Sequence, residues 1–312
     1  VATIYGADAL GGVINLITKT GSENVFEVDL NSKYESNGTY NFDGAFNYNH
    51  KNFNSTIYGG RNFFDGYQPE GDSRDQLWNP REQYFGGIGL IQRFGKNQLR
   101  FKSDYLNETI YDKGEPVTTP YDALAFDSEY KTKRFSNTLF YNCKINNHSK
   151  INANASYQLY ERKKVDYIKD MVTLDSYMVE NQTDNTTLFN QLNIKADYSN
   201  YKNPKLSYQA GIDLNYEIGS GAKIPGEQSI SDYAVFGSIE WEAIKRFNIR
   251  PAFRIADNSI YGTHFIPSVN LKYGFNTNSY IRASVANGYR APSLKELYLE
   301  FVDVNHNILG NS

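Results

Sequence analysis

The sequence is poor in the residues that build disulfides and metal sites. It contains one Cys, two Met, two Trp and four His among 312 residues. One cysteine excludes an internal disulfide, and the scattered histidines lack the spacing of a metal site. No run of about 18 apolar residues is present, which excludes a transmembrane helix. The net charge is -3 and no Lys/Arg cluster stands out, so the sequence gives no case for nucleic-acid binding.

Motifs of the common enzyme classes are absent as well. The sequence has no Gly-x-Ser-x-Gly elbow, no phosphate-cradling glycine loop and no His-Glu-x-x-His pair. No paired carboxylates occur at a spacing that suggests acid–base work. We therefore expect a protein that is not an enzyme and that carries no cofactor.

The sequence does contain long segments in which apolar and polar residues alternate. The segments that begin at Ile151 and Leu206 show this most clearly. Successive strand side chains point to opposite faces, so each segment forms a strand with one apolar and one polar face. A soluble sheet has the same period, but many of these segments reach the length of about 9–11 residues that a tilted membrane strand needs. We expect thirteen such strands, near residues 24–35, 39–50, 53–65, 83–94, 98–111, 129–145, 149–167, 184–198, 205–218, 231–243, 247–257, 263–275 and 279–287.

The connections between these strands alternate between short and long. Six short turns lie at residues 50–52, 95–97, 146–148, 199–204, 244–246 and 276–278. The long polar loops lie at residues 66–81, 112–128, 168–181 and 219–230, and in the tail from Gly288. Outer-membrane barrels have short turns on one rim and long loops on the other. Only the tight connection Ser36-Asn37-Gly38 departs from this pattern.

The alternation also assigns the two faces of the sheet. The outward, lipid-facing set should include Leu192, Ile194, Ile212, Leu214, Leu271 and the single cysteine, Cys143. The inward set should include Gln191, Asn193, Asp213, Asn215 and Lys272. The 26 Tyr and 19 Phe fit a membrane barrel, whose interfaces are rich in aromatics. The candidates for this girdle are Tyr34, Tyr48, Tyr58, Tyr198, Tyr208, Tyr216, Tyr233 and Tyr273.

The strand count and the N-terminus together indicate a fragment. Bacterial single-chain barrels have even strand numbers, whereas thirteen is odd. The chain begins at Val1, with neither Met nor a signal peptide. We therefore expect part of a longer chain, whose sheet is open or incompletely closed.

Both ends of the chain carry motifs of one family. The first reads Tyr-Gly-x-x-Ala-x-Gly-Gly-x-Ile-Asn-x-x-Thr and is matched by Tyr5, Gly6, Ala9, Gly11, Gly12, Ile14, Asn15 and Thr18. It resembles the end of the plug domain of TonB-dependent outer-membrane receptors. The second, Tyr289-Arg290-Ala291-Pro292, is similar to the Phe/Tyr-Arg-Ala-Pro box that follows a barrel strand in the same family. Asn311 marks the expected beginning of the Asn-Pro-x-Leu box.

The resemblance implies an all-β fold, a transmembrane antiparallel barrel around a plug. The chain would hold about 13 of about 22 barrel strands. Residues 1–21 would be the C-terminal end of the plug domain, inside the curve of the sheet, and residues 22–312 a partial barrel. The implied function is import of a siderophore, haem or cobalamin across the outer membrane of a Gram-negative bacterium. The implied partners are the TonB complex, reached through an N-terminal part, the small-molecule ligand and outer-membrane lipid.

Several loop residues are candidate ligand contacts. Tyr67, Arg74, Trp78 and Arg81 lie in one long loop, where an aromatic and a cation can hold a planar or anionic ligand. The alternative is a loop that packs on its own aromatic side chain. Arg290 can face the lumen and pair with a plug carboxylate, or be a solvated arginine at a strand end.

His306 lies where haem receptors of this family carry a histidine, between the two C-terminal boxes. An imidazole can ligate haem iron, but residues 303–307 also have the composition of a polar turn.

Two other function classes stay open on the sequence. A passive porin or other outer-membrane barrel protein would share the strand pattern but lack the plug segment. A soluble β-sandwich adhesin would share the alternation but not need a membrane.

Overall fold

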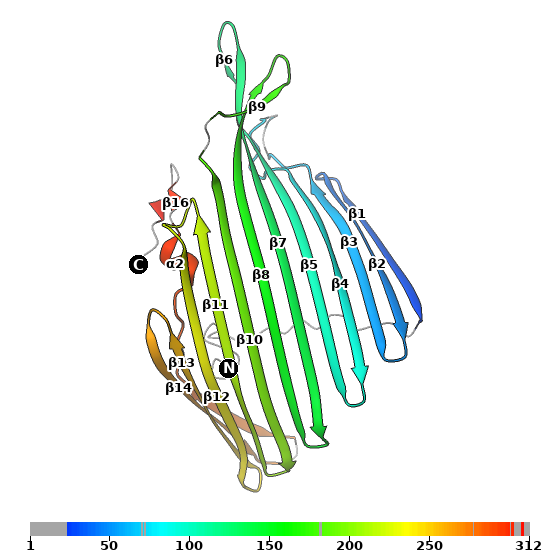
Figure 1. Cartoon of the computed structure of the whole chain (residues 1–312), viewed down its shortest axis with the longest axis vertical. Coiled ribbons are helices and arrows are strands. Elements are labelled where there is room, and N and C mark those ends of the chain that lie inside the picture. The colour runs from blue at the N-terminus through cyan, green and yellow to red at the C-terminus, as the bar shows by residue number, and fades with distance from the viewer. Residues whose placement is uncertain are drawn as a thin grey trace.

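The computed structural model describes residues 24–69, 71, 73–180, 183–276 and 278–299, and the strand backbone at 301–302 and 307–308. One large antiparallel sheet dominates it (Figure 1). Thirteen strands follow one another in sequence order, each hydrogen-bonded to the next. They are β1 (Phe26–Glu35), β2 (Thr39–His50), β3 (Phe53–Phe64), β4 (Arg81–Phe94), β5 (Asn97–Lys113), β7 (Ala123–Asn146), β8 (Ser149–Asp170), β10 (Asn185–Asn203), β11 (Leu206–Gly221), β12 (Gln228–Ile244), β13 (Phe247–Asn258), β14 (Gly262–Gly274) and β15 (Tyr280–Ala286).

Smaller elements lie outside this run of thirteen strands. β6 (Val117–Thr118) pairs with β7, and β9 (Ser176–Met178) pairs with β8. The helix α2 (Leu294–Tyr298) follows β15, and β16 (Phe301–Val302) pairs with β17 (Asn307–Ile308). No helix among the described residues is long and apolar enough to cross a membrane.

All thirteen predicted strands are confirmed, in order and within six residues of their ends. The larger differences are at the predicted loops 112–128 and 168–181, which are partly strand. β7 and β8 pair from Leu124 with Asp170 to Asn146 with Ser149. Their far ends rise above the neighbouring strands, together with the β6–β7 and β8–β9 hairpins (Figure 1). The polar composition of these segments predicted loops, but backbone pairing continues without an apolar face where both faces meet water.

The long loops and the short turns lie on opposite rims of the sheet. The turns between β2 and β3, β4 and β5, and β7 and β8 are at one rim. The far ends of β7 and β8, with the β6–β7 and β8–β9 hairpins, extend beyond the other rim (Figure 1). The tight connection at Ser36-Asn37-Gly38 joins β1 to β2 at the long-loop rim, where Gly38 adopts a φ of 81°. A side chain there would collide with Asp65, whose Cβ is 2.7 Å from the ideal Cβ position. Glycine therefore permits the tight turn and the close approach to the β3 end.

The two faces of the sheet carry the residues that the alternation assigned to them. Ile212 is 44% exposed on the outward face, whereas its neighbour Asp213 is 8% exposed on the inward face. Cross-strand pairing keeps this phase, because Asp213 lies opposite Lys195 on β10 and Ala234 on β12. One cavity contacts the polar residues of β7, β8 and β10 to β15, so the polar face is concave.

Tyr58 is a wrong assignment within the tyrosine girdle. Its hydroxyl donates to the carboxylate of Asp104, an inward residue of β5. Tyr58 sits opposite Ala45 and Gly87, and its ring occupies the space that a side chain at Gly87 would take. It therefore points inward, since its polar end has a partner only there.

The buried apolar residues form two small clusters on the inward face. One joins Ile224 and Ile230 to Leu294 and Leu297 of α2. The other joins Ala234, Ala256 and Ile266, with Tyr289 packed against them. Both clusters hold the segment after β15 against the sheet.

Candidate ligand-binding lumen

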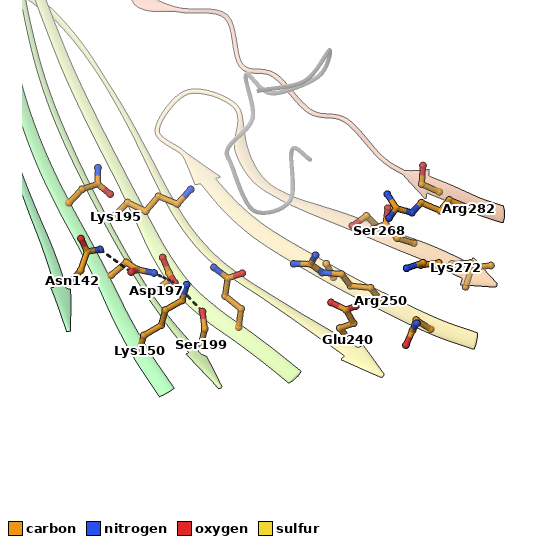
Figure 2. Close-up of a pocket in the computed structure, with 18 of the residues that line it drawn as sticks. Asn142, Lys150, Lys195, Asp197, Ser199, Glu240, Arg250, Ser268, Lys272 and Arg282 are labelled. Atoms are coloured by element: carbon orange, nitrogen blue, oxygen red, sulfur yellow. Dashed lines mark hydrogen bonds between the residues drawn. The ribbon is translucent and has the colours of Figure 1, made fainter. Parts of the chain in front are cut away.

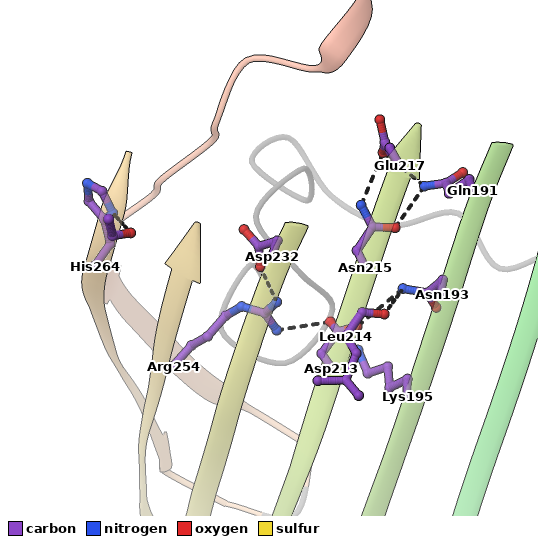
Figure 3. A network of polar contacts seen from close by, with 11 residues as sticks. Gln191, Asn193, Lys195, Asp213, Leu214, Asn215, Glu217, Asp232, Arg254 and His264 are labelled. Atoms are coloured by element: carbon purple, nitrogen blue, oxygen red, sulfur yellow. Dashed lines mark hydrogen bonds and ion pairs between the residues drawn. The ribbon is translucent and has the colours of Figure 1, made fainter. Parts of the chain in front are cut away.

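A buried arginine organises the inward face between β11 and β13. The Arg254 side chain is 3% exposed and donates to the Asp213 carboxylate at 3.0 Å (Figure 3). Its second terminal nitrogen lies 3.7 Å from the Asp232 carboxylate. The Lys195 ammonium approaches Asp213 from the other side at 3.7 Å. Two carboxylates and two cations thus neutralise one another where burial would penalise an isolated charge.

An amide network continues this polar surface toward the long-loop rim. The Gln191 amide donates to Asn215 at 2.9 Å and to Glu217 at 3.1 Å (Figure 3). Asn215 also donates to Glu217, at 3.1 Å. The Asn193 amide donates to Asp213 and to the Leu214 carbonyl at 3.4 and 3.3 Å. Fixed orientations of this kind suit a lumen wall that presents a defined set of donors and acceptors.

The segment after β15 folds over this network. Tyr289 stacks on the His264 imidazole, with ring centroids 3.8 Å apart and planes 17° from parallel. Ala291, Pro292 and Ser293 line a cavity of 250 Å³ together with inward residues of β10 to β13. β15 has already ended at Ala286, and Pro292, which has no amide hydrogen, offers no further strand pair where the chain lies over the lumen wall.

Helix α2 is tied down by its own first turn. Ser293 and Glu296 form a capping box, in which the Ser293 amide donates to the Glu296 carboxylate at 2.8 Å. Arg290 donates twice to the same carboxylate, at 2.8 and 2.6 Å. These donors lower the pKa of Glu296 to about 2. The predicted Arg290 cation is therefore engaged by Glu296 of its own segment.

A wider cavity of 1010 Å³ lies nearer the short-turn rim. Its wall carries the cations Lys150, Lys195, Arg250, Lys272 and Arg282 and the carboxylates Asp197 and Glu240 (Figure 2). The inward face is therefore polar over much of its length, as a water-filled lumen requires.

Tyr67 and Trp78 are brought together by the structure. Their backbones exchange two hydrogen bonds, at 2.9 and 3.0 Å, and their rings lie 5.5 Å apart. Both side chains are exposed, so the loop presents an aromatic pair at the long-loop rim.

Arg74 and Arg81 are placed differently. Arg74 donates to both oxygens of Asp127 at 2.6 Å and to the Gly114 carbonyl at 2.8 Å. This pairing joins the β3–β4 loop to β7 and to the connection between β5 and β6, and it raises the pKa of Arg74. Arg81 begins β4 and is exposed, away from that ion pair.

The plug motif residues and His306 lie outside the described residues. No group of three or more potential metal-ligating side chains occurs in the part of the chain that the structure describes.

The sequence did not single out the centre of the network, nor a group of arginines and tyrosines on β7 and β8. Arg254 has the inward phase of β13, and Tyr130, Arg134, Tyr160 and Arg162 have the inward phase of β7 and β8. The alternation predicts that these side chains point inward. It does not predict the register between strands, which decides which of them become neighbours.

The comparisons with known proteins agree on the fold. A family model described as TonB dependent receptor-like, beta-barrel matches residues 7–311. No curated protein matches the chain significantly.

Three solved structures illustrate the likeness. A mutant ferric enterobactin receptor of Pseudomonas aeruginosa aligns with a TM-score of 0.68 at 14% identity, over 94% of this chain and 48% of that one. The siderophore receptor PirA of Acinetobacter baumannii gives 0.67 at 12% identity, over 94% and 47%. The FrpB iron transporter of Neisseria meningitidis gives 0.64 at 13% identity, over 87% and 48%.

At these identities the structural likeness establishes the fold alone, and the chain spans about half the length of these receptors. The family model, in contrast, covers nearly the whole sequence. Its match agrees with the open antiparallel sheet and its polar concave face. The chain belongs to the TonB dependent receptor-like β-barrel family.

Proposed function

We propose that the whole protein is a TonB-dependent, energy-coupled receptor in the outer membrane of a Gram-negative bacterium. It imports an iron chelate, either a siderophore or haem, or else cobalamin. The family match over residues 7–311 carries this proposal. Similarity to receptors described as binding ferric enterobactin or other siderophores favours an iron chelate among the three ligands.

The proposed mechanism is binding and release without covalent chemistry. Ligand arrives at the long-loop rim, where Tyr67 and Trp78 expose an aromatic pair. It then meets the polar wall around Asp213 and Arg254. Energy enters through the TonB complex, which acts on an N-terminal part and moves the plug, to which residues 1–21 would belong.

The candidate contacts differ in what they offer. Arg81 is exposed at the start of β4 and has the rim position a ligand contact needs. Arg74 and Arg290 are each bound by a carboxylate of this chain. They contribute to binding by holding the loop and the α2 segment in place.

Growth of an iron-starved Gram-negative strain without its own receptors tests the proposal. The full-length protein should restore growth on at least one supplied ferric siderophore or on haem, or, because cobalamin carries no iron, growth of a cobalamin-requiring strain on cobalamin. The same strain without TonB should not grow. Equal growth with and without TonB would instead identify a passive porin, because only the receptor needs energy.

A haem arm of the same experiment tests His306. If haem is the ligand, His306→Ala should reduce haem-dependent growth and leave siderophore use unchanged, because an iron ligand is lost. Unchanged haem use would make His306 a turn residue.

A further inference from the structure

Two arginines and two tyrosines pair on the inward face of β7 and β8, Arg134 with Tyr160 directly across the ladder and Arg162 with Tyr130 diagonally. The Arg134 guanidinium lies 5.3 Å from the Tyr160 ring, and the Arg162 guanidinium lies 5.1 Å from the Tyr130 ring. Lys164 adds a third cation, 5.9 Å from the Tyr130 ring. We call these five residues the Arg–Tyr patch. Strand register creates it, because Tyr130 faces Lys164 and Arg134 faces Tyr160 across the β7–β8 ladder.

Other elements bring more positive charge to the same place. Burial lowers the pKa of Lys223, in the β11–β12 connection, and the nearby charges of Arg162 and Lys164 lower it further. Lys295 of α2 lines a hollow of 340 Å³ with Arg134 and Tyr160. Cations therefore converge on the patch from three separate parts of the chain.

Carboxylates of the described residues only partly balance this charge. Asp166 pairs with Lys164 at 2.9 Å, and Asp112 on β5 interacts electrostatically with Lys164 and Tyr130. Glu217, on the wall of the hollow, accepts from Gln191 and Asn215. No described carboxylate lies within ion-pair distance of Arg134 or Arg162.

An unsatisfied polar atom lies inside the patch. Thr132 lies between Tyr130 and Arg134 on the inward phase of β7, opposite Arg162. Its side chain is 1% exposed, and its hydroxyl oxygen has no hydrogen-bond partner. A buried hydroxyl without a partner is costly, and an incoming acceptor group would satisfy it.

We propose that the Arg–Tyr patch is a lumen subsite for a ferric chelate that carries several negative charges on aromatic ligand groups. The inference rests on the proposed import function and narrows its ligand class. When one face of an arginine guanidinium lies on a tyrosine ring, its other face and its N–H groups remain free to contact a ligand. A ligand ring stacks on that face while anionic oxygens accept from the edge. Neutral chelates gain nothing from the converging cations.

Binding to the purified full-length protein tests the subsite. The probes are a ferric tris-catecholate, which is polyanionic and aromatic, and a neutral ferric trihydroxamate. The double variant Arg134→Gln/Arg162→Gln should lose at least about tenfold in affinity for the tris-catecholate, since each charge-assisted contact is strong. Its affinity for the trihydroxamate should be unchanged.

A matched control lies on the same strands, one residue away. Lys133 and Lys163 adjoin Arg134 and Arg162 in sequence but have the opposite, outward phase, and both are exposed. Lys133→Gln/Lys163→Gln removes the same charge and should leave both affinities unchanged. Arg134→Lys/Arg162→Lys keeps the charge without the planar group, and should retain part of the tris-catecholate affinity.

The possible outcomes separate the subsite from the proposed function. Parent protein that binds only the trihydroxamate, or an equal loss in the Lys133/Lys163 control, overturns the subsite and leaves import standing. A loss that affects both probes equally in the Arg134/Arg162 variant also overturns it, because that marks a structural role. Parent protein that binds no chelate, haem or cobalamin overturns the proposed function and the subsite together.

Discussion

Arg254 shows how a single residue can hold a polar wall together. Its guanidinium joins Asp213 on β11 to Asp232 on β12, from its own place on β13. A buried pair of this kind adds little net stability relative to apolar residues, but removing one partner leaves an uncompensated charge. The stability of the polar wall therefore depends strongly on Arg254, although this arginine makes few contacts.

Replacing this arginine should destabilise the folded protein. Arg254→Met should lower the free energy of unfolding by about 3 kcal/mol, because Asp213 loses its nearest cation in a buried site. Urea unfolding of the full-length protein in lipid vesicles measures the change. Arg254→Met/Asp213→Asn should recover part of it, and Arg250→Met, which removes an arginine from the same strand and face, should cost less than about 1 kcal/mol. Equal losses at positions 254 and 250 would contradict this account.

Glu296 gives the α2 cap a defined pH dependence. Its pKa is about 2 in the folded chain, below the ordinary 4.5. A depressed carboxyl pKa stabilises the fold fully above the unfolded value, and this contribution declines as the pH falls through the folded value. Hydrogen exchange at the α2 amides should therefore be slower in the parent than in Glu296→Gln at neutral pH. The difference should shrink as the pH falls from about 4.5 toward about 2; a constant difference would show that the carboxylate is not responsible.

At the scale of the strands, alternation predicted what depends on one segment alone. The alternation is clearest in β8 and β11, and strand pairing through β10 keeps the phase of both. Tyr58 was misassigned because its inward partner, Asp104, lies two strands away in the sheet. The convergence of Arg162, Lys164 and Lys223 was likewise invisible, because it depends on where the β11–β12 connection folds.

The two faces of β10 should respond differently to one added charge. Ile194 is outward and 36% exposed, and Asn193 beside it donates to Asp213 on the inward face. In the proposed membrane setting, Ile194→Arg places a charge in lipid and should cost about 2–4 kcal/mol. Asn193→Arg places the same side chain in the wet lumen and should cost clearly less. Urea unfolding in vesicles compares the two, and a larger loss at position 193 would reverse the assignment of the faces.

The whole molecule is a curved wall with two unlike rims. The sheet is curved, with its polar face on the concave side. Each of its thirteen long strands pairs with the long strands next to it in sequence. The rims were predicted from connection length, and the structure places the β6–β7 and β8–β9 hairpins and the short turns at opposite ends (Figure 1). The assignment of residues 1–21 to a plug stays a prediction, because those residues lie outside the described part of the chain.

The two rims should face opposite sides of the outer membrane. Tyr121, in the loop between β6 and β7, is 91% exposed on the long-loop side, and Lys245 lies in the short β12–β13 turn. Cys143, and any cysteine that the full-length protein carries elsewhere, is first replaced by serine so that a single introduced thiol reports each position. In intact cells that make the full-length protein, a membrane-impermeant maleimide should label Tyr121→Cys but not Lys245→Cys. After the outer membrane is permeabilised, both should react, because long loops face outward and short turns face the periplasm. Labelling of Lys245→Cys in intact cells would place the short turns outside and overturn the proposed direction of import.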